Sequence, residues 1–426
     1  MSVISELCKN QKLPRMIKVR QRFNSTRIEA SDIPNAVRAS LDRVKGNMKP
    51  GMRIAITVGS RGISNIALIT KSIVSCVKSY GAEPFVVPAM GSHGGAAAER
   101  QLALINGYGV TEEYIGCPIL SSVEVVRIAT SPEGHPVYQD RCAHEADGII
   151  VSCRVKPHNA FRGRYESGML KMMCVGLGNH EGAEVCHRED QAGLARLVPL
   201  IGEAVLQNSK IVCGFCIIEN NKEETYRLEA VFPEDIMDRE PELLQEAKAL
   251  MPRIWLEHAD VLVVDQIGKN ISGGGADSNV TGRYFVPNMT GGLGPQRMVM
   301  LDLTPETHGN FGGTGAADIV TKRMFSKMDF DETNPNTIVS RCLTASSIPL
   351  VIDGDEDTIK IAIQSCFGID FENPRIIRIK NTLHLDTIYV SEAMLQDVRD
   401  NPNLEQLGEP EYMRFDEDGY TCGLEY

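Results

Sequence analysis

The stretch RIAITVGSRGISNIALITKSIVSCV, residues 53–77, contains the pattern that decides the fold. An apolar run rich in β-branched residues ends at Gly59-Ser60-Arg61-Gly62. Beyond this turn, apolar residues recur from 66 to 77 at the spacing of one helix face. A buried strand, a polar turn and a helix in this order predict one unit of a parallel α/β sheet.

The same pattern recurs along the chain. We expect further strands at 84–90, 148–155, 209–219, 259–267 and 297–303, and helices at 96–105 and 189–207. The charged segment 221–257 is typical of a helical connector. We therefore predict an α/β protein of two domains, each with a largely parallel sheet flanked by helices and with the active site in the cleft between them.

The predicted domain boundary follows the connector. An N-terminal domain, residues 1–256, is expected to contain the catalytic residues, and a C-terminal domain, residues 257–399, to close the site. The polar and aromatic tail, residues 400–426, is expected to pack back onto the first domain.

Composition excludes several classes of protein. With 44 basic and 56 acidic residues the net charge is −12, which argues against nucleic-acid binding. No apolar run approaches a membrane span and the N-terminus lacks an apolar signal core, so we expect a cytoplasmic protein. The twelve cysteines are scattered, and the Cys213-x-x-Cys216 pair lies in an apolar run that predicts a buried strand. Whether the protein is a monomer or a homo-oligomer stays open.

Polar residues follow three of the predicted strands. Arg61, His93 and His158 each come at a strand's carboxyl end, where open α/β sheets bind their ligands. An arginine can bind a carboxylate or phosphate, and histidines can transfer protons near neutral pH. The alternative is that each is an ordinary loop residue. The glycine-rich Gly91–Gly95 turn lacks the lysine of a phosphate-binding loop.

Residues 156–187, KPHNAFRGRYESGMLKMMCVGLGNHEGAEVCH, hold the most concentrated chemistry. A helix can start at Gly168 and project Lys171 from its first turn toward the strand ends. The alternative, a solvated lysine, fits poorly with the apolar residues on both sides of it. His180 lies in turn-like surroundings and is expected to be structural.

These residues together carry a resemblance. Gly-Ser-His (91–93), Pro-His (157–158), Ser-Gly-x-x-Lys (167–171) and His187 resemble the lactate racemase (LarA-type) family, whose members use a nickel-pincer nucleotide. The likeness covers mainly residues 20–220, and the glycine-rich loop 274–279, with Asp277-x-Asn279, echoes the family's second domain.

The resemblance implies roles for these residues. The cofactor would be the nickel complex of pyridinium-3,5-bisthiocarboxylic acid mononucleotide, attached covalently to Lys171. His187 would be the protein ligand to nickel in a square-planar site. His93 and His158 would be the acid/base pair, and Arg61 would bind the substrate carboxylate. Further contacts to the nucleotide would come from Gly59, Ser60 and Gly168.

The sequence departs from the family pattern at three places. Gly282 and Phe285 stand where the family has a substrate-binding glutamine and lysine, so we predict Asn279 and Arg283 as substrate contacts there. The only tryptophan is Trp255, so the family's second-domain tryptophan is missing.

The third departure is a loop between His158 and Lys171 that is longer than in the lactate enzyme and adds Arg162, Arg164 and Glu166. We predict Arg162 and Arg164 as substrate-binding residues. A pocket without the bulky ring and with added polar groups favours a substrate larger than lactate.

The predicted function is a racemase or epimerase that inverts the α-carbon of a 2-hydroxy acid, with a sugar acid such as an aldonate, epimerised at C2, as substrate. The alternatives are a racemase of lactate or another small 2-hydroxy acid, a non-catalytic relative that binds cofactor or acid, and an oxidoreductase that releases the keto acid. The expected partners are the hydroxy acid and the cofactor biosynthesis enzymes, and neither nucleic acid nor membrane.

Overall fold

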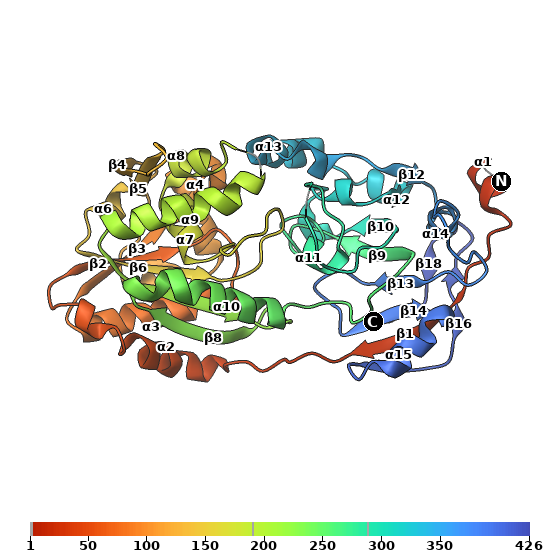
Figure 1. Ribbon diagram of the computed structural model, residues 1–426, viewed down its shortest axis with the longest axis horizontal. Coiled ribbons are helices and arrows are strands. Elements are labelled where there is room, and N and C mark those ends of the chain that lie inside the picture. The colour runs from red at the N-terminus through yellow and green to blue at the C-terminus, as the bar shows by residue number, and fades with distance from the viewer. Residues whose placement is uncertain (1–2, 190, 288) are drawn as a thin grey trace. The chain divides into compact units, whose positions relative to one another are not determined.

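The computed structural model describes residues 3–189, 191–287 and 289–426 (Figure 1). The chain forms two compact units: unit 1 comprises Met1–Phe23 and Pro252–Tyr426, and unit 2 comprises Asn24–Met251. Both are α/β units built on a sheet with parallel strands, which confirms the predicted fold class. The predicted cleft between the domains stays a prediction. No described helix is long and apolar enough to cross a membrane.

Unit 2 is built on a five-stranded sheet in the order β3-β2-β6-β7-β8. The first four strands are mutually parallel and β8 is antiparallel to β7. Their bounds are β2 (Arg53–Val58), β3 (Glu83–Pro88), β6 (Gly148–Arg154), β7 (Ile211–Glu219) and β8 (Thr225–Val231). The segment expected as a connector, 221–257, thus contains the edge strand β8. A hairpin of β4 (Val125–Thr130) and β5 (Pro136–Asp140) forms a separate small sheet.

Helices cover both faces of this sheet, which explains its almost continuous apolar strands. Ile54 and Ile56 pack with one group of helices and Ala55 with the other, as alternation along a strand requires. The first group comprises α2 (Ile33–Leu41), α3 (Ile66–Ser79) and α4 (Ala98–Gly107). The second comprises α7 (Met169–Lys171), α9 (Gln191–Asn208) and α10 (Ile236–Leu250). The Cys213-x-x-Cys216 pair is buried in β7, as predicted.

The strand order creates a topological switch point. The chain enters the sheet at β2, adds β3 on one side and later adds β6 on the other. Connections then leave the carboxyl ends of β2 and β6 in opposite directions, and it is at such a point that open α/β sheets bind their ligands.

Unit 1 is built on a nine-stranded sheet in the order β12-β11-β10-β9-β13-β14-β1-β15, with β16 also paired to β1. The strands from β12 to β13 are parallel, and the rest are antiparallel. Their bounds are β9 (Val261–Ile267), β10 (Arg297–Leu303), β11 (Ile319–Thr321), β12 (Leu350–Ile352), β13 (Ile376–Ile379), β14 (Thr387–Ser391), β1 (Arg15–Gln21), β15 (Leu404–Gln406) and β16 (Glu411–Tyr412). The helices of this unit include α1 (Val3–Cys8), α11 (Ser278–Thr281), α12 (Lys322–Phe325), α13 (Phe330–Ser340), α14 (Asp355–Gln364) and α15 (Leu395–Asp400).

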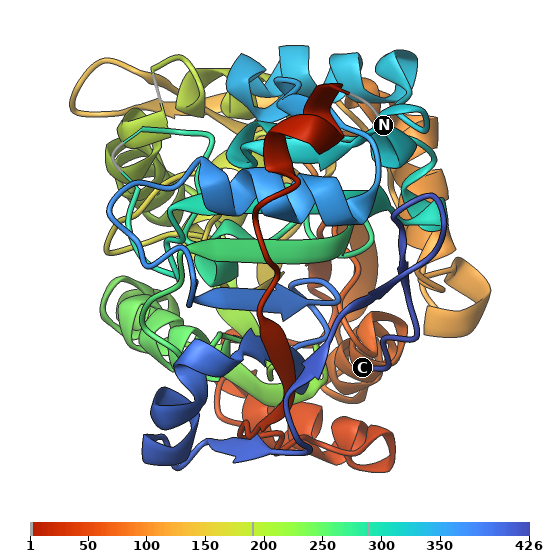
Figure 2. The same ribbon diagram turned by 90° about the vertical axis from the view of Figure 1, so that its right-hand side faces the viewer.

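Both ends of the chain differ from the predicted domain division. Strand β1 pairs with β14 and β15, so the first residues belong to unit 1 and not to the unit that follows them (Figures 1 and 2). The tail was predicted to pack on the other unit, but it too belongs to unit 1. The physical reason is that its strands β15 and β16 complete the edge of β1.

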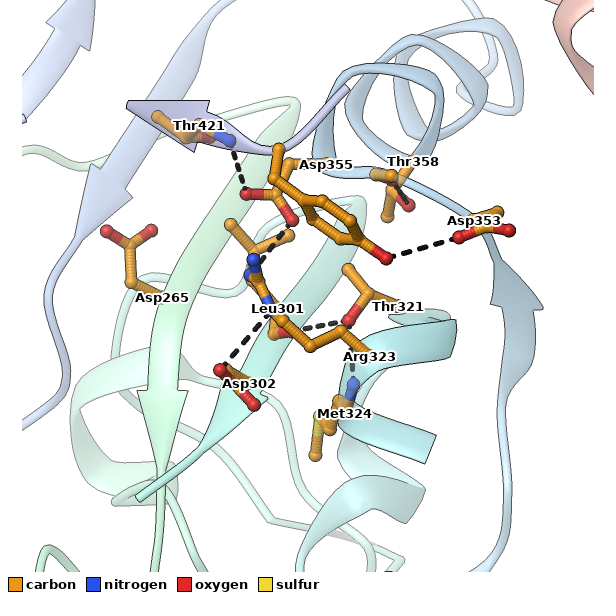
Figure 3. Close-up of polar contacts among 12 residues, drawn as sticks. Asp265, Leu301, Asp302, Thr321, Arg323, Met324, Asp353, Asp355, Thr358 and Thr421 are labelled. Atoms are coloured by element: carbon orange, nitrogen blue, oxygen red, sulfur yellow. Dashed lines mark hydrogen bonds and ion pairs between the residues drawn. The ribbon is translucent and has the colours of Figure 1, made fainter. Parts of the chain in front are cut away.

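The last residues, 413–426, form a C-terminal strap over unit 1 that includes the hairpin of β17 (Arg414–Phe415) and β18 (Thr421–Cys422). The Tyr420 hydroxyl donates to Asp353 (3.2 Å), and the Thr421 N–H donates to Asp355 (2.9 Å), which also pairs with Arg323 (3.0 Å; Figure 3). The Tyr426 hydroxyl donates to Asp265 (2.6 Å). The strap therefore adds polar partners to charged groups of β9, of the residue after β12 and of the start of α14.

Candidate active site

Three predicted site residues lie at neighbouring strand ends of unit 2. Arg61 follows β2, His93 follows β3 and His158 follows β6. Because β2 lies between β3 and β6, these ends share one edge of the sheet. Arg61 contributes to lowering the pKa of both histidines, so each histidine lies within electrostatic range of Arg61.

The imidazole of His93 has two polar neighbours at one ring nitrogen. Its Nδ1 lies 2.8 Å from the Ser60 hydroxyl and 3.2 Å from the carbonyl of Met90. Because a carbonyl only accepts, we assign the proton to Nδ1, which leaves Nε2 free to accept. Although the side chain keeps an exposed surface, burial by the surrounding protein, followed by Arg61 and Lys171, lowers the pKa of His93 to about 4.

His158 is held in the opposite way. The backbone N–H of Ala160 donates to its Nδ1 (3.1 Å), so the proton of the neutral ring lies on Nε2. Burial, then Lys171 and His187, lower the pKa of His158 well below that of an ordinary imidazole. Near neutral pH both rings are thus uncharged, and Nε2 can accept a proton on His93 and donate one on His158.

Lys171 lies where α7 passes into a π-helical turn, Met172–Gly176, a local geometry that often marks functional sites. Its Nζ lies 5.8 Å from the centre of the Phe161 ring. Burial, with a further effect of Arg61, lowers the pKa of Lys171 to about 8. Among the residues that the structure describes, this amine has neither a hydrogen-bond acceptor nor an ion-pair partner. It is therefore a reactive amine near neutral pH.

A buried carboxyl supports the helix start beneath Lys171. Glu240 of α10 accepts the N–H of Leu170 (3.0 Å), and burial raises the pKa of Glu240 to about 7. A Cβ on Gly168 would lie 2.4 Å from the same carboxyl, so this position requires glycine. Sequence reasoning missed Glu240, although a charged residue among Ile236 and Leu243 on one helix face was a usable signal.

His187 follows the last turn of α8 (Asn179–Cys186) and its N–H donates to Ala183 (2.9 Å). It contributes to the lowered pKa of both His93 and His158, which places it in the same cluster. His180, on the first turn of α8, is exposed. In the described part of the chain, no group of three or more His, Cys, Asp or Glu side chains is arranged to hold a metal unaided.

The two predicted arginines of the 156–167 loop have protein partners. The half-buried Arg162 donates to the carbonyl of His158 (2.5 Å), and the exposed Arg164 pairs with Asp238 on α10 (3.1 Å). Gly59 packs closely on Met172, because a Cβ at this position would lie 3.1 Å from the methyl carbon of Met172. The predicted contacts of Arg162, Arg164, Gly59 and Ser60 to ligands stay predictions.

Asn279 and Arg283, the other predicted substrate contacts, belong to unit 1. The Asn279 amide donates to Asp277 (2.9 Å), at the start of α11. Arg283 pairs with Asp318 (2.9 Å) and donates to the carbonyl of Ala316 (3.1 Å). A role for Arg283 in substrate binding would require an exchange of these bonds, and both assignments stay predictions.

The cluster in unit 2 is positively charged. Within the described residues, the Arg61 guanidinium has no acceptor or ion-pair partner. Nearby acids are already paired, Glu219 with Arg154 (2.5 Å) and Glu166 with Lys248 (2.7 Å). A free guanidinium, a lysine and neutral histidines together suit a small molecule with a carboxylate.

Comparisons with known proteins add little to this description. No family model and no curated protein matches the sequence. Among solved structures, the lactate racemase apoprotein from Thermoanaerobacterium thermosaccharolyticum is similar, with a TM-score of 0.49 and 11% identity over 87% of this chain and 99% of that chain. A similarity of this size does not define a family, a substrate or a reaction.

Proposed function

We propose that the protein is a racemase or epimerase of 2-hydroxy acids that depends on a nickel-pincer nucleotide. One observation carries the proposal. Two neutral histidines with opposite protonated nitrogens lie in one cluster with a lysine of lowered pKa and an arginine that has no ion-pair partner among the described residues. Binding an acid alone does not need a matched proton acceptor and donor.

The residues of the cluster fit such a cofactor. Lys171 has a reactive amine and the structure gives it no other task among the described residues. His187 would be a protein ligand to nickel, with the remaining ligands supplied by the nucleotide. Held by Lys171 and His187, the group would supply a hydride acceptor and donor for the α-carbon.

The chain's own residues account for the rest of the chemistry. Arg61 binds and orients the substrate carboxylate. His93 Nε2 takes the hydroxyl proton on one face, and His158 Nε2–H serves the other face. The lowered pKa values keep both imidazoles neutral at the pH where Lys171 is partly deprotonated.

A sugar acid such as an aldonate, epimerised at C2, is the finer proposal. Its support is the missing second-domain tryptophan, since Trp255 stacks on Phe23 (6.0 Å between ring centres) and donates to the carbonyl of Arg22 (3.1 Å). The added polar residues of the 156–167 loop no longer support it, because Arg162 and Glu166 contact His158.

The first experiment tests cofactor attachment. The chain is co-expressed with the cofactor biosynthesis enzymes, and intact mass and nickel content are measured. Added mass on Lys171 with bound nickel is expected for wild type and is lost in Lys171→Arg. In His187→Ala the added mass is expected to persist while nickel falls. Wild-type protein without added mass and without nickel would overturn the proposal.

The second experiment separates racemisation from the alternatives. The loaded enzyme is given 2-hydroxy acids, lactate and aldonates, with deuterium on the α-carbon. Inverted product with retained deuterium supports the proposal. Free keto acid points to an oxidoreductase, and unchanged substrate that still binds points to a non-catalytic relative. High activity on lactate with none on aldonates would exclude the sugar-acid proposal alone.

A further inference from the structure

The loop that connects β6 to α7 is closed at its base. Lys156 N–H donates to the carbonyl of Ser167 (3.1 Å), and Ser167 N–H donates back to the carbonyl of Lys156 (3.3 Å). The two ends of the loop therefore lie together, with His158 just inside one end and Lys171 just beyond the other. A closed loop of this length restricts the positions that its residues can take.

Two side chains of this loop hold the backbone of His158. Glu166 Oε2 accepts the His158 N–H (2.7 Å), and Arg162 Nη1 donates to the His158 carbonyl (2.5 Å). Arg162 and Glu166 also lie 3.6 Å apart as an ion pair. Both backbone polar groups of His158 are thus bound by residues that follow it in the same loop.

The holding carboxylate is itself anchored. Glu166 is 1% exposed, and its second oxygen accepts from Lys248 of α10 (2.7 Å). A carboxylate buried to this extent is strongly destabilising without partners, so its three contacts act together. Through Lys248 the loop is fixed to a long helix that packs on the sheet.

The same loop also fixes the imidazole ring of His158. Its Nδ1 accepts the Ala160 N–H, and the buried Phe161 ring lies 4.4 Å from it between ring centres. The same Phe161 ring lies 5.8 Å from the Lys171 amine. The orientation of His158 relative to Lys171 therefore depends on the shape of this loop.

We propose that Arg162 and Glu166 are positioning residues that hold His158 in the orientation where its Nε2 serves the bound acid. The inference rests on the proposed function only for the acid/base role of His158. Arg162 and Glu166 act on the substrate through His158, and they do not need to touch it. In this proposal the loop serves to orient an acid/base group.

The test reads the imidazole itself and needs neither cofactor nor substrate. Full-length protein is labelled with ¹³C-histidine, and the ring C–H signals are recorded by NMR. Nine histidines keep the spectrum simple, and His158→Gln identifies the signal of interest. In wild type, the adjacent Phe161 ring is expected to displace the His158 signals from free imidazole values.

Arg162→Met and Glu166→Ala are expected to move these signals toward free imidazole and to broaden them, while the His93 signals stay in place. Glu166→Gln, which retains an acceptor for the His158 N–H, is expected to restore most of the wild-type shift. Arg164→Met is the matched control, because this arginine of the same loop pairs with Asp238 and is expected to leave the signals unchanged.

Unmoved His158 signals in a folded Arg162→Met protein would overturn the inference. Because Arg162 is partly exposed and Glu166 is buried, Arg162→Met is expected to disturb folding less than the Glu166 variants. Equal shifts in Arg164→Met would also overturn it, since they would reflect general loosening. A protein that shows the expected shifts but binds no nucleotide would retain this inference and lose the proposed function.

Discussion

Lys171 departs clearly from an ordinary lysine, because its amine is surrounded by protein without an acceptor among the described residues. We predict that an acylating reagent modifies Lys171 of the cofactor-free protein with a rate that is half-maximal near pH 8, the value to which burial lowers its pKa. The rate is followed by peptide mass spectrometry against Nα-acetyl-lysine as reference. A profile that coincides with the reference would contradict the assigned environment.

Arg61 is the second residue with a sharp prediction. Arg61→Met is expected to weaken binding of a 2-hydroxy carboxylate to the loaded enzyme by about 10-fold or more, since a charge-assisted hydrogen bond contributes roughly 1.5–3 kcal/mol. Arg61→Lys keeps the charge but loses the two-pronged hydrogen bonding of the guanidinium, so its affinity is expected to lie between those of wild type and Arg61→Met. Arg127→Met, which removes an exposed arginine bonded to Thr130, is the control. Equal affinities for all three variants would exclude Arg61 from the site.

At the scale of single residues, the sequence predicted which side chains come together in the site but not the hydrogen bonds that hold them. Arg61, His93 and His158 were expected together because each follows a parallel strand, and the structure brings them together. The contact of Glu166 with the His158 backbone depends on how a loop closes, which no periodicity encodes. The loop arginines were therefore interpreted as substrate contacts.

Among the elements, α7 and α10 are coupled by a buried carboxyl. The pKa of Glu240 is raised from its ordinary 4.5 to about 7, so the folded protein keeps this proton over a range where the unfolded chain has lost it. Stability due to this group is full below pH 4.5 and falls as pH rises to 7, by about 3 kcal/mol in all.

We predict that Glu240→Gln removes this fall, because an amide has no proton to lose. Wild-type unit 2 is expected to lose stability relative to the variant between pH 4.5 and pH 7, with the difference constant above that range. Hydrogen exchange of the Leu170 amide, which donates to Glu240, measures the local opening free energy. Parallel pH curves for the two proteins would contradict the raised pKa.

Element prediction succeeded where burial made the pattern strong. The strand at 53–58 and the helix from 66 lie where expected, because both have apolar residues at the period of their structure. The segment 221–257 was predicted as a helical connector, and it contains the helix α10 but also the strand β8. Strand β8 has a mixed burial pattern at the sheet edge, which weakens its alternation.

For the whole molecule, the two units make separate predictions possible. Deleting the strap residues 413–426 is expected to lower the stability of unit 1 by about 3 kcal/mol or more, because several hydrogen bonds of roughly 1 kcal/mol each are lost. These bonds include those of Tyr420, Thr421 and Tyr426. Strands β9 and β13 are expected to exchange amide protons faster, because Tyr426 contacts Asp265 of β9 and Thr421 contacts Arg378 of β13.

The amides of unit 2 serve as the internal reference in the same exchange experiment, because the strap belongs to unit 1 alone. Tyr412→Ala, which alters an exposed residue just before the strap, is the control for changes in the tail as such. If amides of unit 2 exchanged faster by the same factor as those of unit 1, the strap would not stabilise unit 1 through these hydrogen bonds.

The pairing of β1 has a consequence for how the protein is made on the ribosome. Gln21 at the end of β1 bonds to the carbonyl of Leu385, which lies 364 residues later in the chain. At about 5–20 residues per second, β1 emerges some 20 to 70 s before its partner strand exists. During that time all of unit 2 is complete and can fold, while β1, whose Met16, Ile17 and Val19 are buried in the finished protein, remains unpaired. Nascent chains halted before β14 are thus expected to expose a strand that chaperones recognise.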